Sequence, residues 1–188
     1  MNSGNTAIKR NKPSKPLTDF MHDRQIMFPN GFHISYYDHG CGKGDDLKWL
    51  LNNGYLADGW DPIYSPKKPN IKKRDVVLCN YVINVINNKL ERIECIKEAW
   101  SRVRVDGLFL LSTRTDKEIN KLAVKNNWKK YKDGYITSKN TFQKGFSLKE
   151  LAQLILDSID DIDKVVIRED KKSSYSAIYV VKNNLGVK

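Results

Sequence analysis

Gly40, Gly42 and Gly44 alternate with other residues just after a predicted β-strand at residues 33–38. An apolar stripe downstream of them predicts a helix that begins at Asp45. Glycines in a turn between a strand and a helix allow positive φ angles and let a ligand approach the backbone closely. This stretch is therefore a candidate ligand-binding turn.

Carboxylates around the glycine turn restrict the ligand that it can bind. Asp45 stands where the dinucleotide fingerprint requires a glycine, and Asp45 and Asp46 together disfavour a diphosphate at the helix entrance. Asp38 can attract an amine directly or through water, and Asp61 can accept hydrogen bonds from both hydroxyls of a ribose. S-adenosylmethionine (SAM), which carries a sulfonium, an amine and a ribose, fits these groups best. A dinucleotide, or a glycine turn without any small ligand, remains an alternative.

Segments with strand-like and helix-like patterns alternate along the chain. The alternation predicts an α/β fold with a doubly wound, mostly parallel, Rossmann-like sheet and a C-terminal antiparallel hairpin. The carboxyl ends of parallel strands share one edge, which places Asp38, Asp61 and Asn80 along one rim. The predicted strands are residues 33–38, 56–60, 75–80, 107–112 and the hairpin 164–168 and 177–182, and the predicted helices are residues 17–23, 45–54, 87–104, 115–126 and one from Leu148 onward.

The chain has 188 residues, enough for one ordinary domain. Residues 1–16 are polar and basic and are expected to form an N-terminal arm, and residues 17–188 the domain. Cys41, Cys79 and Cys95 are widely spaced and form no CxxC pair, so we expect neither a disulfide framework nor a metal site. No apolar run approaches the roughly 20 residues of a membrane span, and the polar N-terminus lacks the pattern of a signal peptide. A cytoplasmic location without membrane attachment is expected.

Several motifs extend the interpretation from a ligand to a family. The stretch Asp38–Asp46 resembles the SAM-binding motif of class I SAM-dependent methyltransferases. More narrowly, the chain resembles the methyltransferase family associated with DNA phosphorothioation, from about residue 6 to residue 155. This resemblance implies a methyltransferase fold and SAM bound by the glycine turn. The matching segments are Thr6–Arg10, Ser14–Pro16, Asp38–Asp46, Gly59–Pro62, Asp75–Ile86 and Thr141–Lys144.

Asn80 and Tyr81 follow the predicted strand at residues 75–80, where class I enzymes keep groups that face the substrate. DNA amino-methyltransferases resemble one another there in a tetrad of acid or amide, two prolines and an aromatic residue. This chain keeps the amide and the aromatic residue but has neither proline. The Asn80 amide can accept a hydrogen bond from an exocyclic amine, and Tyr81 can stack on a flipped base. Alternatively, Asn80 caps the next turn and Tyr81 packs in the core.

Lysine and arginine number 33 against 22 acidic residues, which gives a net charge of +11 and favours a polyanionic partner. Four lysines follow Asp61 closely, and a basic stretch interleaved with aromatic residues surrounds the Thr141–Lys144 motif. Such residues suit phosphates and unstacked bases, although a solvated loop has the same composition. The candidate contacts to substrate or nucleic acid are Lys67, Lys68, Lys72, Lys73, Gln143 and Lys144.

Together these features predict a SAM-dependent methyltransferase that acts on nucleic acid, with DNA favoured over RNA. Asn80 and Tyr81 are the candidate catalytic residues. One alternative is a non-catalytic module that binds SAM or nucleic acid in a DNA modification or defence system. The other alternative is a methyltransferase of small molecules or proteins.

Overall fold

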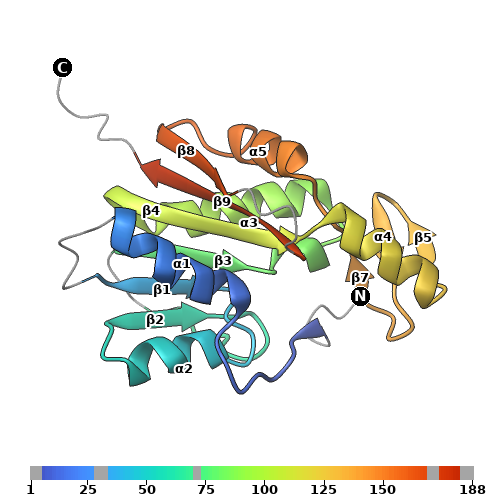
Figure 1. Cartoon of the computed structure of the whole chain (residues 1–188), viewed down its shortest axis with the longest axis horizontal. Coiled ribbons are helices and arrows are strands. Elements are labelled where there is room, and N and C mark those ends of the chain that lie inside the picture. The colour runs from blue at the N-terminus through green and yellow to red at the C-terminus, as the bar shows by residue number, and fades with distance from the viewer. Residues whose placement is uncertain (1–5, 28–33, 70–72, 169–173, 183–188) are drawn as a thin grey trace.

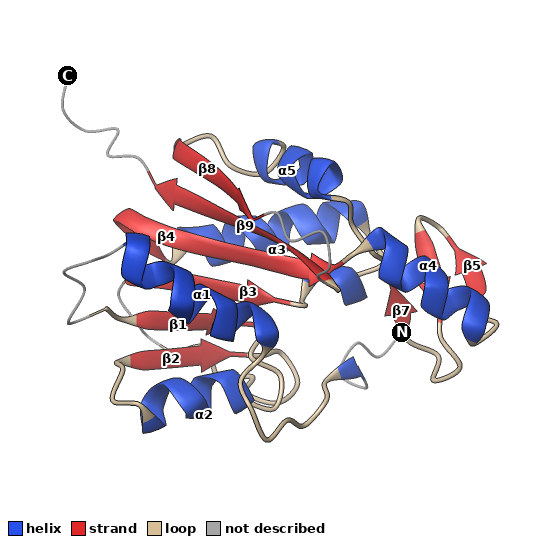
Figure 2. Cartoon of the chain, viewed as in Figure 1, coloured by secondary structure: helices blue, strands red, loops and turns tan. Residues whose placement is uncertain are grey.

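The computed structural model describes residues 6–27, 34–69, 73–168 and 174–182. Within these residues, a central sheet has the strand order β2-β1-β3-β4-β9-β8, with helices on both faces (Figures 1 and 2). Its strands are β1 (Tyr36–His39), β2 (Ala57–Trp60), β3 (Arg74–Asn80), β4 (Val103–Arg114), β8 (Ile162–Arg168) and β9 (Tyr175–Lys182).

The first four strands in this order, β2, β1, β3 and β4, run parallel to one another. β9 pairs antiparallel with β4, and β8 pairs antiparallel with β9 at the edge of the sheet. The predicted mostly parallel sheet with a C-terminal antiparallel hairpin is therefore confirmed. Because β1 lies between β2 and β3, the strand order changes direction there, and the rim beside β1 is where such sheets bind ligands.

Both faces of the sheet are covered, which explains the continuous apolar run in β3. Val76 and Leu78 face the layer that contains α1 (Lys15–Met27) and α2 (Asp45–Asn52). Val77 and Cys79 point the other way, toward α3 (Lys89–Ser101) and α5 (Leu148–Leu156). Among the described helices, none combines the length and the apolar character that a membrane crossing requires.

Local capping chemistry sets the starts of two helices. The Ser147 hydroxyl accepts a hydrogen bond from the Glu150 amide, and the Glu150 carboxylate accepts one from the Ser147 amide. This capping box confirms the predicted start of α5. Thr115 accepts a hydrogen bond from the Glu118 amide and begins α4 (Asp116–Lys125) in the same way.

The segment between α4 and α5, expected to be an irregular loop, contains a small antiparallel sheet. Its strands have only two or three residues, too few for an alternating apolar pattern to reveal them. Tertiary contacts hold it: the Phe142 ring is 1% exposed, and the Lys144 amide donates to the Asn84 carbonyl at 2.8 Å. The strands are β5 (Lys129–Tyr131), β6 (Gly134–Ile136) and β7 (Phe142–Gln143).

The first helix begins earlier in the sequence than the composition of the N-terminal segment predicts. α1 begins at Lys15 and continues to Met27, whereas the sequence predicts a shorter helix over residues 17–23. The boundary drawn after residue 16 therefore falls within the first turn of α1. The division into an arm and a domain remains a prediction.

Candidate cofactor and substrate cavity

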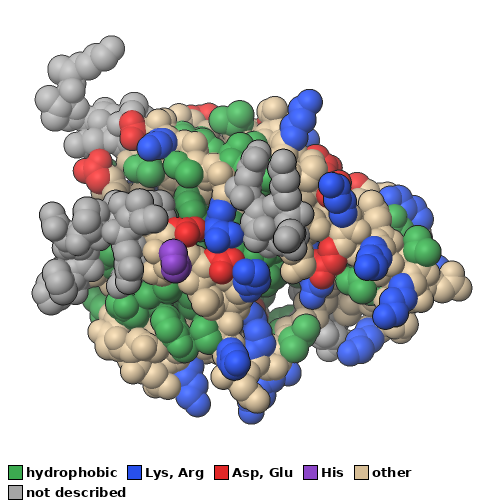
Figure 3. All heavy atoms as spheres, viewed as in Figure 1, with side chains coloured by type: hydrophobic (Ala, Val, Ile, Leu, Met, Phe, Trp, Pro, Cys, Tyr) green, Lys and Arg blue, Asp and Glu red, His purple; other side chains and the backbone are tan. Residues whose placement is uncertain are grey.

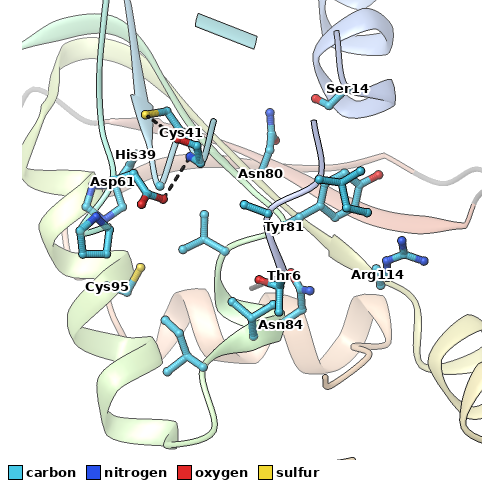
Figure 4. A pocket seen from close by; sticks show the side chains of 18 of the residues that line it. Thr6, Ser14, His39, Cys41, Asp61, Asn80, Tyr81, Asn84, Cys95 and Arg114 are labelled. Carbon is cyan, nitrogen blue, oxygen red and sulfur yellow. Dashed lines mark hydrogen bonds between the residues drawn. The ribbon is translucent and has the colours of Figure 1, made fainter. Parts of the chain in front are cut away.

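A cavity of about 1100 Å³ opens at the carboxyl ends of β1, β2 and β3. Ligand pockets in proteins commonly measure roughly 300–1,000 Å³, so this one has room for a cofactor together with a second molecule. Figure 4 shows Asp61, Cys41 and Cys95 toward one side of the cavity and Arg114 on the other, with Tyr81 between them. The cavity lies at the rim where the sequence places Asp61 and Asn80.

The three glycines of the turn have left-handed φ angles, but they meet different surroundings. Gly40 has φ of 76°, and a Cβ atom there would lie 2.5 Å from a methyl carbon of Val82. Gly42 has φ of 54° and faces Ala7, whereas Gly44 has open space around it and precedes α2. Gly40 and Gly42 line the cavity, and Gly44 is not part of its lining. Gly40 thus lets the turn pack closely against the loop after β3.

The two acids at the start of α2 bind the N-terminal segment of the chain. The Asp45 carboxylate accepts a hydrogen bond from the Arg10 amide at 2.6 Å. The Asp46 carboxylate, which is buried, accepts from both the amide and the hydroxyl of Ser14, each at 2.6 Å. This anchoring places Thr6, Arg10 and Ser14 in the cavity wall.

Asp61 is held at the end of β2 by backbone amides. One carboxylate oxygen accepts a hydrogen bond from the Gly42 amide at 3.0 Å. The other oxygen accepts from the amides of Ile63 and Tyr64 at 2.9 and 3.0 Å, which closes the turn after β2. A carboxylate oxygen has more than one acceptor site, so Asp61 retains capacity for hydroxyl groups of a ligand.

Asp38 is 3% exposed and is not part of the cavity lining. Burial raises the pKa of its carboxyl, and the nearby carboxylates of Asp46 and Asp61 raise it further, while the Arg10 guanidinium opposes them. A cationic group bound nearby would favour the charged form of this carboxyl. Asp38 therefore lies behind the wall rather than in it, and an interaction with a ligand amine would pass through an intervening group or water.

Asn80 presents a polar atom that the protein itself does not satisfy. Its side chain is 8% exposed, and its Oδ1 accepts a hydrogen bond from the Ser112 hydroxyl at 2.8 Å. Its Nδ2 has no partner among the described residues. Because a serine hydroxyl can donate or accept, rotation of both groups lets Asn80 present either its amino or its carbonyl edge.

Tyr81 and Asn84 adjoin Asn80 in the cavity lining. Tyr81 has φ of 59°, which is rare for a bulky residue and marks a locally strained backbone. Its ring packs edge-to-face against Tyr175, and burial raises the pKa of its hydroxyl to about 12. Asn84 donates from Nδ2 to Oε1 of Gln143 at 3.1 Å, and among the described residues its Oδ1 has no partner. The small sheet thus brings Gln143 to the cavity.

The predicted lysine contacts lie outside the cavity lining. Lys67 and Lys73 are exposed, and Lys72 lies outside the described residues. Lys68 forms an ion pair with Glu98, and its Nζ lies 4.6 Å from the centroid of a Trp60 ring. Lys144 forms ion pairs with Glu150 and Asp133 at 3.2 and 3.8 Å. A role for these lysines in substrate binding remains a prediction.

One face of α3 lines the cavity and was not selected from the sequence. Glu91, Glu94, Cys95 and Glu98 recur at intervals of three and four residues, which places them on one helical face. That spacing is the signal in the sequence, but only the packing of α3 shows that the face borders a cavity. Among the described residues, the carboxylates in the lining are Asp45, Asp61, Glu91, Glu94, Glu98 and Glu118 and the cations are Arg10, Lys15, Lys43, Lys97 and Arg114.

Comparison with solved structures identifies the architecture. A SAM-dependent methyltransferase from Methanosarcina mazei is 17% identical, covers 82% of this chain and 94% of its own length, and has a TM-score of 0.58. The Burkholderia thailandensis 1,6-didemethyltoxoflavin-N1-methyltransferase, solved with its substrate and S-adenosylhomocysteine, is 15% identical over 90% of this chain and 78% of its own, with a TM-score of 0.62. The Synechocystis magnesium protoporphyrin IX methyltransferase, solved with bound S-adenosylhomocysteine (SAH), is 13% identical. The match covers 96% of this chain and 93% of that enzyme, with a TM-score of 0.59.

No family model matches the chain, and no curated protein matches it. The motif-level resemblance to the family associated with DNA phosphorothioation therefore gains no support from these comparisons. The structural likeness concerns the fold. This chain has the fold of class I SAM-dependent methyltransferases.

Proposed function

We propose that this protein is a SAM-dependent methyltransferase whose acceptor is nucleic acid, with DNA favoured over RNA. The observation that carries the methyltransferase part of the proposal is the make-up of one cavity, and the charge of the chain supports the nucleic-acid part. The glycine turn, Asp61, Asn80 and Asn84 all line this cavity. Such a cavity offers separate groups for a cofactor and for an acceptor.

The residues present fit SAM. Gly40 and Gly42 leave their backbone accessible in the cavity wall, and Asp61 has acceptor capacity for ribose hydroxyls. The Asp61 carboxylate lies in the wall that would meet a ligand carrying an amine and a sulfonium, and such a bound cation would favour the charged form of Asp38 behind it. When bound, SAM supplies a methyl group that is already activated by its sulfonium. The protein then has to hold and align the acceptor, which is a large source of rate acceleration.

Asn80 and Tyr81 are the proposed acceptor-binding residues. The Asn80 amide would hold the nucleophile through either its amino or its carbonyl edge, since the Ser112 hydroxyl can adapt to both. The strained backbone at Tyr81 directs the chain after β3 along the cavity, and its ring offers an aromatic surface beside Asn84. Both roles deepen the interpretation drawn from the sequence and remain proposals.

The charge of the whole chain supports a polyanionic acceptor. The net charge is +11, and Figure 3 shows Lys and Arg side chains gathered over α4 on the face that it presents. Lys67 is exposed in the loop after β2, outside the cavity, where it can contact a phosphate while a base enters. Lys73, also exposed, directly precedes β3 and lies at the opposite edge of the sheet. The motifs that resemble the family associated with DNA phosphorothioation point to DNA in particular.

A small-molecule acceptor is the second candidate, and the cavity itself favours it. Among its described lining residues, carboxylates are as well represented as cations, so the interior is not a phosphate-binding groove. Two of the structural neighbours named above are methyltransferases of a toxoflavin precursor and of magnesium protoporphyrin IX. A neutral or cationic heterocycle would meet less repulsion in this cavity than a polyphosphate.

Incubation with methyl-labelled SAM tests the two candidates directly. We expect mass spectrometry of hydrolysed DNA to show a labelled methyl nucleoside, with RNA and metabolite extracts as parallel acceptors. Label in the metabolite fraction alone would replace nucleic acid by a small molecule. Binding of SAH without any transfer would indicate a non-catalytic module, and no binding at millimolar SAM or SAH would refute the cofactor assignment.

The salt dependence of DNA binding tests the lysines after β2. Affinity should fall steeply between about 50 and 200 mM salt, and replacing Lys67, Lys68, Lys72 and Lys73 by alanine should lower the slope by up to about 0.9 for each phosphate that these lysines neutralise. A matched control removes four exposed charges elsewhere, away from α4, through Lys48, Lys89, Lys149 and Lys164. An equal change in both variants would mean that only net charge matters, and no change in the first would exclude these lysines.

A further inference from the structure

A cluster of two thiols and an imidazole forms part of the cavity wall and has no part in the proposed methyl transfer. Cys95 on α3 and His39 at the end of β1 both line the cavity, and Figure 4 shows them on the side of Asp61. Cys79, on β3, is fully buried behind them. Cys95 packs against the buried core cluster that contains Cys79, and both Cys79 and His39 influence the pKa of its thiol.

His39 contributes a buried imidazole to this cluster. Its side chain is 2% exposed, and its Nδ1 has no hydrogen-bond partner among the described residues. Packing fixes the ring, since the centroids of Tyr37 and Trp60 rings lie 6.1 and 5.3 Å away. A buried imidazole beside a thiol, on the wall of a cavity, is the arrangement that activates cysteine as a nucleophile.

The cavity contains a second thiol in an opposite environment. Burial raises the pKa of Cys41 to about 12, and the carboxylates of Asp38 and Asp61 raise it too. The interaction with Cys79 lowers the pKa of Cys95, and His39 adds to that effect, against opposition from burial and Glu98. Because the thiolate is the reactive form, two cysteines of one cavity should differ strongly in reactivity.

We propose that Cys95 is a nucleophilic modification site that reacts with peroxides and soft electrophiles entering the cavity, with Cys79 as its resolving thiol. With a hydroperoxide, the Cys95 sulfur forms a bond to oxygen as the O–O bond breaks, and the leaving oxygen takes a proton from solvent. Cys79 then attacks the Cys95 sulfur, the S–O bond breaks, and the hydroxyl leaves as water with the Cys79 proton. The two thiols lose two electrons in total, and the peroxide is reduced.

This pairing follows from the elements that carry the two cysteines. β3 and α3 pack against each other, Cys95 packs against the buried cluster that contains Cys79, and each thiol shifts the pKa of the other, so the two thiols lie close enough to interact. The resulting bond would join α3 to β3 one residue before Asn80. Oxidation would therefore act on the wall that the proposed cofactor and acceptor share.

Peptide mapping measures this reactivity without SAM or an acceptor, so its result is independent of the proposed function. Tryptic cleavage places Cys41, Cys79 and Cys95 in three different peptides. At pH 7, iodoacetamide should modify Cys95 at least about tenfold faster than Cys41 in the wild-type protein. One equivalent of hydrogen peroxide should join peptides 75–89 and 93–97 with the loss of two hydrogens.

Two variants test the role of Cys79 as the resolving thiol, with Cys41 as the control. In Cys79→Ser, peroxide should leave a sulfenic acid on Cys95 that dimedone traps, whereas Cys41→Ser should behave as wild type. Circular dichroism and thermal melting establish that each variant is folded. The iodoacetamide and peroxide measurements on the wild-type protein test the proposal even if a variant fails to fold. Equal labelling of Cys41 and Cys95, or a protein that keeps both Cys79 and Cys95 reduced after peroxide, would overturn the proposal.

Discussion

Replacing Asn80 by alanine is expected to lower the rate of methyl transfer by about 100-fold or more, while SAM affinity stays within about threefold of wild type. The physical reason is the position of the side chain. Asn80 lines the cavity, whereas the proposed cofactor contacts come from Gly42 and Asp61. Single-turnover rates with labelled SAM and isothermal calorimetry with SAH separate the two quantities.

The control for Asn80→Ala must account for its buried neighbour. Truncation leaves the fully buried Ser112 hydroxyl without its partner, which costs roughly 1–3 kcal/mol of folding free energy. Ser112→Ala removes the same hydrogen bond but keeps the Asn80 amide, and it should retain most of the activity. If Ser112→Ala is as slow as Asn80→Ala at equal thermal stability, Asn80 acts through the fold of the loop and not on the acceptor.

Asp61→Ala is expected to weaken SAM and SAH binding by about 1–3 kcal/mol, the order of a charge-assisted hydrogen bond. This change corresponds to roughly 5- to 150-fold in the dissociation constant. The carboxylate lies between the glycine turn and the loop after β2, where it bonds the amides of Gly42, Ile63 and Tyr64. Calorimetry with SAH measures the effect.

Asp61→Asn distinguishes ligand binding from loop folding. Its carbonyl oxygen can keep the hydrogen bonds to Ile63 and Tyr64, while the charge and the acceptor for Gly42 are removed. We expect Asp61→Asn to bind SAH more weakly than wild type and to retain the wild-type melting temperature. Wild-type affinity in both variants would remove Asp61 from the cofactor site.

Local patterns in the sequence were sufficient to predict the central sheet and the glycine turn. β3 is a continuous apolar run because both of its faces are buried, and the start of α5 follows from the Ser147–Glu150 capping box. The rim position of Asp61 and Asn80 follows from strand order, since parallel strands end at one edge. Each of these features depends on neighbours in sequence or on the general geometry of parallel sheets.

The small sheet β5–β7 and the course of residues 6–14 required the tertiary structure. The strands of the small sheet are too short for a periodic signal and depend on Phe142 packing into the domain. The N-terminal segment lines the cavity because Asp45 and Asp46 bind amides of Arg10 and Ser14, contacts between residues more than thirty positions apart. From the sequence, these acids indicated only which ligands the turn would disfavour.

The sequence by itself determined the fold class and the candidate cofactor residues, because periodicity and glycine spacing are local properties. Only the tertiary structure decided which side chains share the cavity. It placed Asp38 behind the wall and Lys144 in ion pairs outside the lining, and it brought Cys95 beside His39 and Cys79. These juxtapositions join β1, β3 and α3, and no pattern within one segment records how such elements pack against one another.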